Sequence, residues 1–176
     1  LVAAKAQRRL LYELALSSGL RASEIRHLRV SDLGLDACGV RLDQKWTKNR
    51  KSGFQNLPKR LVSRLAVSVA GMPSASPLIF MPANVTEAFQ RDCRDAGIPR
   101  HIEGEGKVDF HALRTTYATL VVESGASVKE AQTLLRHSSP VLTMNTYARA
   151  RNVRLRELCE RIGHEVMAGE GVGGRQ

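Results

Sequence analysis

Apolar residues recur at helical spacing along most of the chain, and this pattern limits the fold more than any other feature. Residues 4–18 carry such a pattern, and Gly19 follows them as the expected C-cap. Pro58 opens a second clear pattern that contains Leu61, Leu65 and Val69. Further helices are expected over 21–30, from Asn84, from Phe110 to Gly125, from the Ser127–Glu130 capping box onward, from Pro140 to Tyr147, and over 151–167.

The stretches without a helical pattern are short. Residues 37–46 and 53–57 are mixed, and a polar, glycine-containing turn separates them, so a β-hairpin is expected with Lys48 to Ser52 at its tip. Residues 97–107 contain three glycines and one proline, which predicts a loop. The predicted fold class is mainly α with a small antiparallel β-sheet (α+β), in one domain over 1–168, followed by a flexible glycine-rich tail over 169–176.

The charge of the chain is concentrated in two blocks. Of a formal charge of +10, residues 21–60 carry +6 and residues 136–161 carry +4, which predicts one basic surface and a polyanionic partner. No apolar run approaches the ~20 residues that span a membrane, so no membrane partner is expected. Three widely separated cysteines fit neither a disulfide framework nor a zinc site, and a cytoplasmic, reducing compartment is expected.

Residues with catalytic potential are dispersed along the chain. Arg21 begins a helix and a carboxylate follows it, His111 and Arg114 stand at i and i+3, and Tyr147 follows His137 by ten residues. Each of these has an ordinary explanation when taken singly, as a surface pair, a helix-capping histidine or a half-buried tyrosine. Their order and spacing together are what point to a site.

That ordered set resembles the tyrosine recombinase family, which includes phage integrases, Xer-type recombinases and Cre-like enzymes. The resemblance spans residues 8 to 165, and four stretches carry it: GLRASEIRHLRVSDL (19–33), TKNRKSGFQNLP (47–58), DFHALRTTYATLVVESGAS (109–127) and LLRHSSPVLTMNTYAR (134–149). It implies the tyrosine recombinase catalytic-domain fold and site-specific recombination of double-stranded DNA through a 3′-phosphotyrosyl intermediate, with no cofactor and no metal. It further implies a homotetramer on DNA with C-terminal helix exchange, a nucleoid location, and an N-terminal core-binding domain that this chain lacks.

The resemblance also implies a role for each site residue. The expected catalytic set is Arg21, Lys48, His111, Arg114, His137 and Tyr147. Two guanidiniums suit the non-bridging phosphate oxygens, because each offers a planar donor fork and stays charged. A lysine among other cations can protonate the departing 5′ oxygen, His111 can accept the tyrosine proton, and His137 can donate to the phosphate. Glu24 is expected to orient Arg21, and the expected phosphate contacts outside the reacting group are Lys45, Arg50, Lys51 and Arg149.

The sequence leaves several alternatives open. Lys51 competes with Lys48 for the general-acid role, since Lys48 lies farther from Pro58 than is usual. Arg136 stands where the family commonly has glycine, and Thr115 stands where it often has histidine. A non-catalytic module with a helix-turn-helix over 127–147 and a type IB topoisomerase-like relaxing enzyme are the rival functions. The amphipathic segment 151–167 fits either its own domain or a neighbouring protomer.

Overall fold

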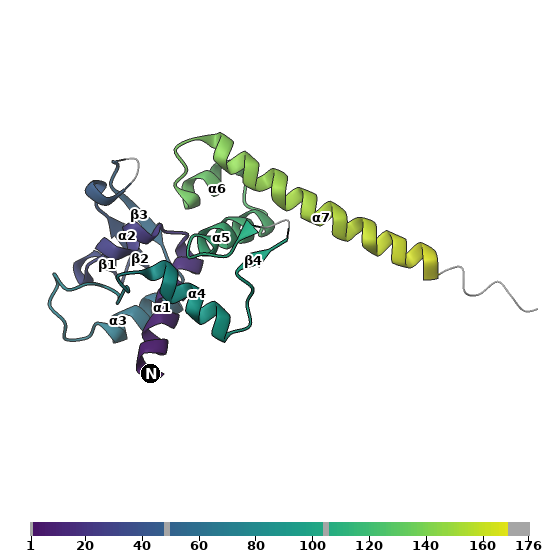
Figure 1. Cartoon of the computed structure of the whole chain (residues 1–176). Helices are drawn as coiled ribbons and strands as arrows, with labels where there is room; N and C mark the ends of the chain where they lie inside the picture. The colour runs from purple at the N-terminus through teal and green to yellow at the C-terminus, as the bar shows by residue number, and fades with distance from the viewer. Residues whose placement is uncertain (1, 48–49, 104–105, 169–176) are drawn as a thin grey trace, which may run out of the picture.

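The computed structural model describes residues 2–47, 50–103 and 106–168, which form seven α-helices and two small antiparallel sheets. The helices are α1 (Val2–Ser18), α2 (Ala22–His27), α3 (Lys59–Ser68), α4 (Val85–Asp95), α5 (Ala112–Glu123), α6 (Val128–Leu135) and α7 (Pro140–Ala168). The strands are β1 (Leu33–Gly34), β2 (Gly39–Leu42), β3 (Gly53–Asn56), β4 (His101–Ile102) and β5 (Gly106–Lys107). The predicted fold class, mainly α with small antiparallel sheets, is confirmed (Figure 1).

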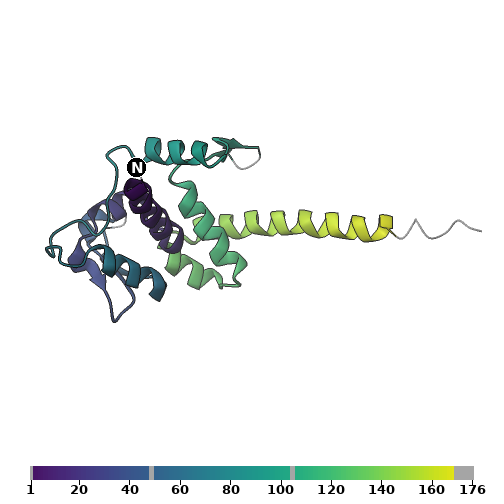
Figure 2. The ribbon, with the colours of Figure 1, turned by 90° about the horizontal axis from the view of Figure 1, so that it is seen from below.

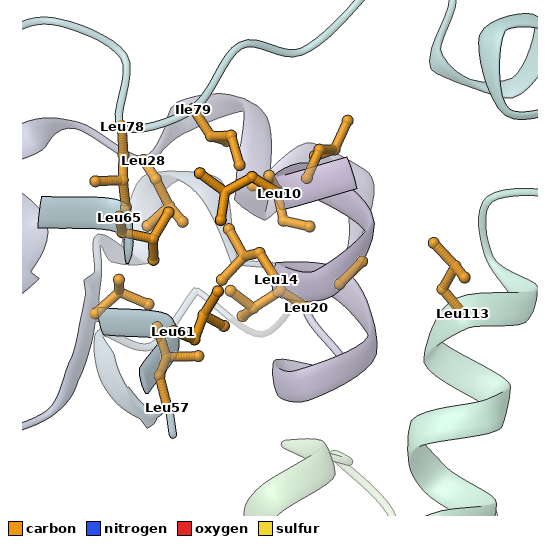
Figure 3. Packing of buried hydrophobic residues seen from close by; sticks show 14 of the residues in the cluster. Leu10, Leu14, Leu20, Leu28, Leu57, Leu61, Leu65, Leu78, Ile79 and Leu113 are labelled. Carbon is orange, nitrogen blue, oxygen red and sulfur yellow. The ribbon is translucent and has the colours of Figure 1, made fainter. Parts of the chain in front are cut away.

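Helix α1 lies at the centre of the main hydrophobic core. Its inner face contributes the fully buried Leu11 and Leu14. Leu14 lies in one cluster with Leu61 and Leu65 of α3 and with Leu78 of the loop before α4 (Figure 3). The predicted end of this helix is confirmed, because Gly19 follows it with a positive φ of 61°. A Cβ at Gly19 would overlap the ring of Tyr117 on α5, so glycine here also permits close packing of α5 on α1.

The predicted hairpin is present and has one more strand than expected. Strand β2 pairs with β3 in the register Val40↔Gln55, and β1 adds to its other edge in the register Leu33↔Val40. A two-residue strand is too short to show an alternating pattern, which explains why β1 was not predicted. The base of the hairpin turn is closed by Thr47, which is buried and whose hydroxyl donates to Lys51 O at 2.9 Å.

Helices α5, α6 and α7 pack together beside the main core. Leu113 of α5 faces the main core from this side (Figure 3), and a smaller apolar cluster joins α5 and α6 through Val121 and Leu135. The predicted capping box of α6 is confirmed, since Ser127 Oγ accepts from the Glu130 N–H and Glu130 Oε2 accepts from the Ser127 N–H. Helix α7 lies across α5 and α6 with its first half, and its second half extends away from the body of the protein (Figures 1 and 2).

Three predicted boundaries are wrong. The expected short helix up to Tyr147 and the separate helix over 151–167 are one continuous helix, α7, because the intervening residues include good helix formers and no glycine or proline. The expected loop over 97–107 contains the strand pair β4–β5, in the register His101↔Lys107. Helix α2 ends at His27 rather than at residue 30, since Leu28 is extended with ψ 133°.

No helix within the described ranges is long and apolar enough to cross a membrane.

Candidate phosphate-binding site

Arg21 is held in place by Glu24 at the start of α2. The Arg21 backbone N–H donates to Glu24 Oε2 at 2.8 Å, and Arg21 Nη1 lies 3.2 Å from Glu24 Oε1. The Glu24 side chain is only 1% exposed, whereas that of Arg21 is 22% exposed. A buried carboxylate that is hydrogen-bonded twice fixes the arginine beside it, and the guanidinium keeps an open side.

Arg114 lies in the first turn of α5 and joins three elements. Its Nη1 donates to the carbonyl of Gly19, after α1, and its Nη2 donates to the carbonyl of Leu135, at the end of α6. The side chain is buried, and this burial lowers the pKa of Arg114 to about 10, with a further contribution from the positive charge of Arg21. The guanidinium therefore stays protonated at neutral pH while it carries a desolvation cost.

The end of α6 brings two further basic side chains to the same place. Arg136 Nη1 lies 3.4 Å from Glu24 Oε1, the oxygen that also pairs with Arg21. His137 follows, and its Nδ1 lies 3.1 Å from the hydroxyl of the fully buried Thr143. Burial, followed by the charges of Arg114 and Arg21, lowers the pKa of His137 to about 4, so the imidazole is neutral at pH 7.

The resulting cluster consists of Arg21, Glu24, Arg114, Arg136 and His137. Three guanidiniums face one carboxylate, and the neutral imidazole adds no charge, so the group carries two positive charges in excess. These groups come from α2, α5 and the end of α6, which are far apart in the sequence. Fixed, partly buried guanidinium forks with an excess of positive charge are suited to hold a phosphate anion.

His111 lies next to this cluster at the N-terminal end of α5. It is exposed, its backbone N–H donates to Asp109 Oδ1 at 2.8 Å, and it lines with Arg114 a cavity of about 140 Å³. Leu20 and Ala22, the neighbours of Arg21 in the sequence, line the same cavity. An imidazole at this rim can exchange protons with solvent and with a group bound beside Arg114.

Tyr147 lies apart from the cluster. Its hydroxyl donates to the carbonyl of Ala126, which follows the C-terminal end of α5, whereas Arg114 lies in the first turn of that helix. Burial and then the charge of Glu130 raise the pKa of Tyr147. Neither Arg21 nor Arg114 is among the groups that shift this pKa. The structure thus brings together four of the residues singled out in the sequence, Arg21, Glu24, Arg114 and His137, but not the tyrosine.

The basic residues of the hairpin are exposed. Lys45, Arg50 and Lys51 are all open to solvent near the turn, and Arg50 has a left-handed backbone with φ 49°. Lys48 lies outside the described residues, as does the side chain of Arg149. The choice between Lys48 and Lys51 therefore stays a prediction.

Two residues of the site have no role assigned from the sequence. Arg136 is notable there only as a departure from glycine, and Thr143, which contacts His137, carries no signal. An arginine directly before a site histidine is the feature that could have drawn attention to this position. Within 2–47, 50–103 and 106–168, no group of three or more His, Cys, Asp or Glu residues is placed to hold a metal ion.

Comparisons with known proteins agree on one family. The model of the phage integrase family matches residues 2–154. The tyrosine recombinase XerC of Staphylococcus carnosus is 26% identical over 153 residues, which cover 85% of this chain and 51% of XerC. The chain spans about half the length of the curated relatives that it matches.

Solved structures of the same kind share the fold. The XerA recombinase has a TM-score of 0.67 at 21% identity, over 90% of this chain and 59% of the other. The Tn1549 transposon integrase in complex with a circular intermediate DNA has a TM-score of 0.65 at 16% identity, over 85% and 59% respectively.

Proposed function

The chain belongs to the phage integrase family, and we propose that it is the catalytic part of a tyrosine site-specific recombinase. Its reaction would cleave and rejoin DNA strands through a 3′-phosphotyrosyl link. The observation that carries the proposal is the cluster in which Arg21, Arg114 and His137 meet around the buried Glu24. A helix-turn-helix module over 127–147 would have no use for a pair of arginines fixed in this way.

The proposed substrate is double-stranded DNA. The formal charge of +10 and the exposed lysines and arginines of the β2–β3 hairpin support a partner with many phosphates. The similar Tn1549 integrase was solved with DNA, which supports the same substrate class here. Lys45, Arg50, Lys51 and Arg149 would contact phosphates that flank the reacting one and position the duplex. The proposed place of action is the cytoplasm, on the DNA of the nucleoid.

In the proposed cleavage step, the phenolic oxygen of Tyr147 attacks the phosphorus and the bond from phosphorus to the 5′ oxygen breaks. His111 accepts the phenolic proton, and Lys48 supplies a proton to the departing 5′ oxygen. Arg21 and Arg114 bind the non-bridging oxygens, whose charge grows in the transition state. In the tautomer in which Nδ1 accepts from the Thr143 hydroxyl, the neutral His137 donates its single N–H, at Nε2, to the phosphate. Attack by a 5′ hydroxyl of another strand reverses these steps, so the ester conserves the bond energy.

The proposed reaction requires Tyr147 to change its position. In the proposed cycle, the first turns of α7 detach from Ala126 and turn Tyr147 toward Arg21 and Arg114. The tyrosine is held by one hydrogen bond and by contacts in a small cluster, which supports a low cost for this step.

We further propose that the projecting half of α7 docks on a neighbouring protomer in a homotetramer on DNA. Three apolar side chains of the second half of α7, Leu155, Ile162 and Val166, are about half or more exposed within the described residues. The helix packs on the body of the protein mainly through α5 and α6. An apolar stripe that does not pack on its own domain is suited to a partner. A chain that stays monomeric on DNA in analytical ultracentrifugation would contradict the proposed docking of α7 on a neighbouring protomer.

The decisive experiment is covalent capture on nicked duplexes of randomised sequence, in which the short fragment that bears the released 5′ hydroxyl diffuses away after cleavage. The expected result is a denaturant-resistant adduct at a 3′ phosphate that peptide mapping assigns to Tyr147. Tyr147→Phe should bind the same DNA and form no adduct, because it lacks the nucleophile.

The rival functions give different results in the same experiment. A non-catalytic binder would form no adduct with the unchanged protein. A type IB-like enzyme would form the adduct and relax supercoiled plasmid as a monomer. An adduct that persists in Tyr147→Phe would show that the nucleophile is another residue.

A further inference from the structure

We infer that Arg136 is a third phosphate-binding guanidinium of this site, in addition to Arg21 and Arg114. Arg136 stands at a position that the family pattern gives to glycine, so no known role is carried over to it. The inference rests on the proposed function only in taking the bound anion to be a phosphate of the DNA backbone.

The backbone at Arg136 is unusual for a residue with a side chain. Arg136 ends α6 with φ 51° and ψ 44°, in the left-handed region that favours glycine at helix ends. A Cβ disfavours this conformation, and such strain tends to be kept where a side chain serves a site. Here the strained position sends the guanidinium into the arginine cluster, beside Glu24.

Within the described ranges, Nη1 of the Arg136 guanidinium has a charge partner but no hydrogen-bond acceptor. Arg136 Nη1 is buried and, among the described residues, has no hydrogen-bond partner, although it lies 3.4 Å from Glu24 Oε1. Both oxygens of Glu24 already accept hydrogen bonds from Arg21, through its backbone N–H and its Nη1. A buried N–H without an acceptor is costly, so Nη1 favours a shift of the guanidinium, whose side chain is 19% exposed, toward an oxygen of a bound phosphate.

The surroundings of Arg136 fit an anion better than a structural ion pair. Glu24 neutralises one of the three guanidiniums, which leaves two positive charges in excess within the cluster. Arg136 also lies against the hairpin, because its Nε is 3.8 Å from where a Cβ on Gly53 would stand. Its guanidinium thus lies between the end of α6, which carries His137, and the start of strand β3 at Gly53.

A purely structural role would give a different outcome. If Arg136 served only to pair with Glu24, its loss would destabilise the fold and leave anion binding unchanged. A phosphate-binding Arg136 affects anion binding in a protein that remains folded. The two roles can therefore be separated by measuring folding and phosphate affinity on the same variants.

The test measures binding of inorganic phosphate to the 176-residue chain by calorimetry and by thermal unfolding, with chloride at equal ionic strength as the blank. Arg136→Gly suits the left-handed backbone and should fold, and we expect its phosphate affinity to fall by about tenfold or more, the effect of one lost charge-assisted hydrogen bond. The control is Arg91→Ala, which removes an equal charge from an exposed pair on α4 and should leave phosphate affinity unchanged.

A second variant covers the case in which Arg136→Gly does not fold. Arg136→Lys keeps the charge and loses the planar fork, so its phosphate affinity should drop by a few-fold. The inference would be overturned if a folded Arg136→Gly variant or the Arg136→Lys variant bound phosphate with wild-type affinity. It would also be overturned if the unchanged protein showed no saturable phosphate binding.

A second measurement, of binding to duplex DNA at several salt concentrations, tests whether the bound anion is a phosphate of the proposed substrate. The slope of log affinity against log salt should fall by about one in Arg136→Gly, because one phosphate contact is lost. An unchanged slope would overturn the assignment of the anion to DNA. Covalent capture is read separately, so Arg136-dependent phosphate binding without any Tyr147 adduct would remove the proposed function and leave the phosphate-binding role of Arg136 standing.

Discussion

The arginine cluster and the surroundings of Tyr147 differ in how firmly the fold holds them. In the cluster, Arg114 bonds carbonyls of two other elements, Glu24 is almost fully buried, and burial and charge shift the pKa values of Arg114 and His137. Tyr147 donates one hydrogen bond, to Ala126, and lies half-buried in a small cluster on a helix whose far half extends away from the body (Figure 1). The proposed anion site is therefore preformed, while the proposed nucleophile has yet to reach it.

The largest expected effect separates these two regions by stability. Arg114→Leu leaves the buried carbonyls of Gly19 and Leu135 without donors, which should lower the free energy of unfolding by about 2–4 kcal/mol and abolish covalent capture. Tyr147→Phe loses one hydrogen bond and should cost about 1 kcal/mol or less. Urea unfolding followed by circular dichroism measures both. Equal losses would break the comparison, because Tyr147 would then be as firmly held as Arg114.

A smaller effect is expected from acid, and only in the cluster. The pKa of His137 is about 4 in the fold and about 6.5 when unfolded, so the unfolded chain binds the proton first as the pH falls. The contribution of His137 to the free energy of unfolding is fully present above pH 6.5 and is lost as the pH falls toward 4. After allowance for solvent screening, the loss between pH 7 and pH 5 should be about 1 kcal/mol.

His137→Gln provides the control, since it should remove this part of the pH dependence in urea titrations at the two values. Tyr147 does not titrate in this range, and Tyr147→Phe should keep the full dependence. A variant without His137 that retains the same slope would show that other groups cause it.

The smallest expected effect tests the move of Tyr147. Ala148 is an exposed position one residue beyond the tyrosine, and Ala148→Gly weakens the helix there by about 1 kcal/mol. If unwinding or turning of this segment limits cleavage, the rate of covalent capture should rise by up to about fivefold. Glu160→Gly weakens α7 in its projecting half and should leave the first-turnover rate unchanged. A slower rate in Ala148→Gly would indicate that the helix must stay intact through cleavage.

Much of the fold could be predicted because its signals are local. The end of α1 at Gly19, the capping box of α6 and the apolar face of α3 each depend on residues within one or two turns. The missed strand β1 has a local cause as well, since it has two residues, and the wrongly divided α7 has no helix-breaking residue over 148–150. The relation between α7 and its neighbours depends on packing across the fold, which no periodic pattern records.

The sequence alone determines four features of this protein: the helices, the position of the hairpin, the excess of basic charge and the order of the candidate site residues. They arise from side-chain chemistry and from backbone preferences over short distances. Which of the candidates meet is a property of the packed fold. Arg114 reaches the carbonyl of Gly19 across 95 residues of chain, Arg136 joins the carboxylate of Glu24, and Tyr147 lies at the other end of α5. Contacts of this range are set by how helices pack, because burial of apolar faces fixes their relative positions and the charged groups follow.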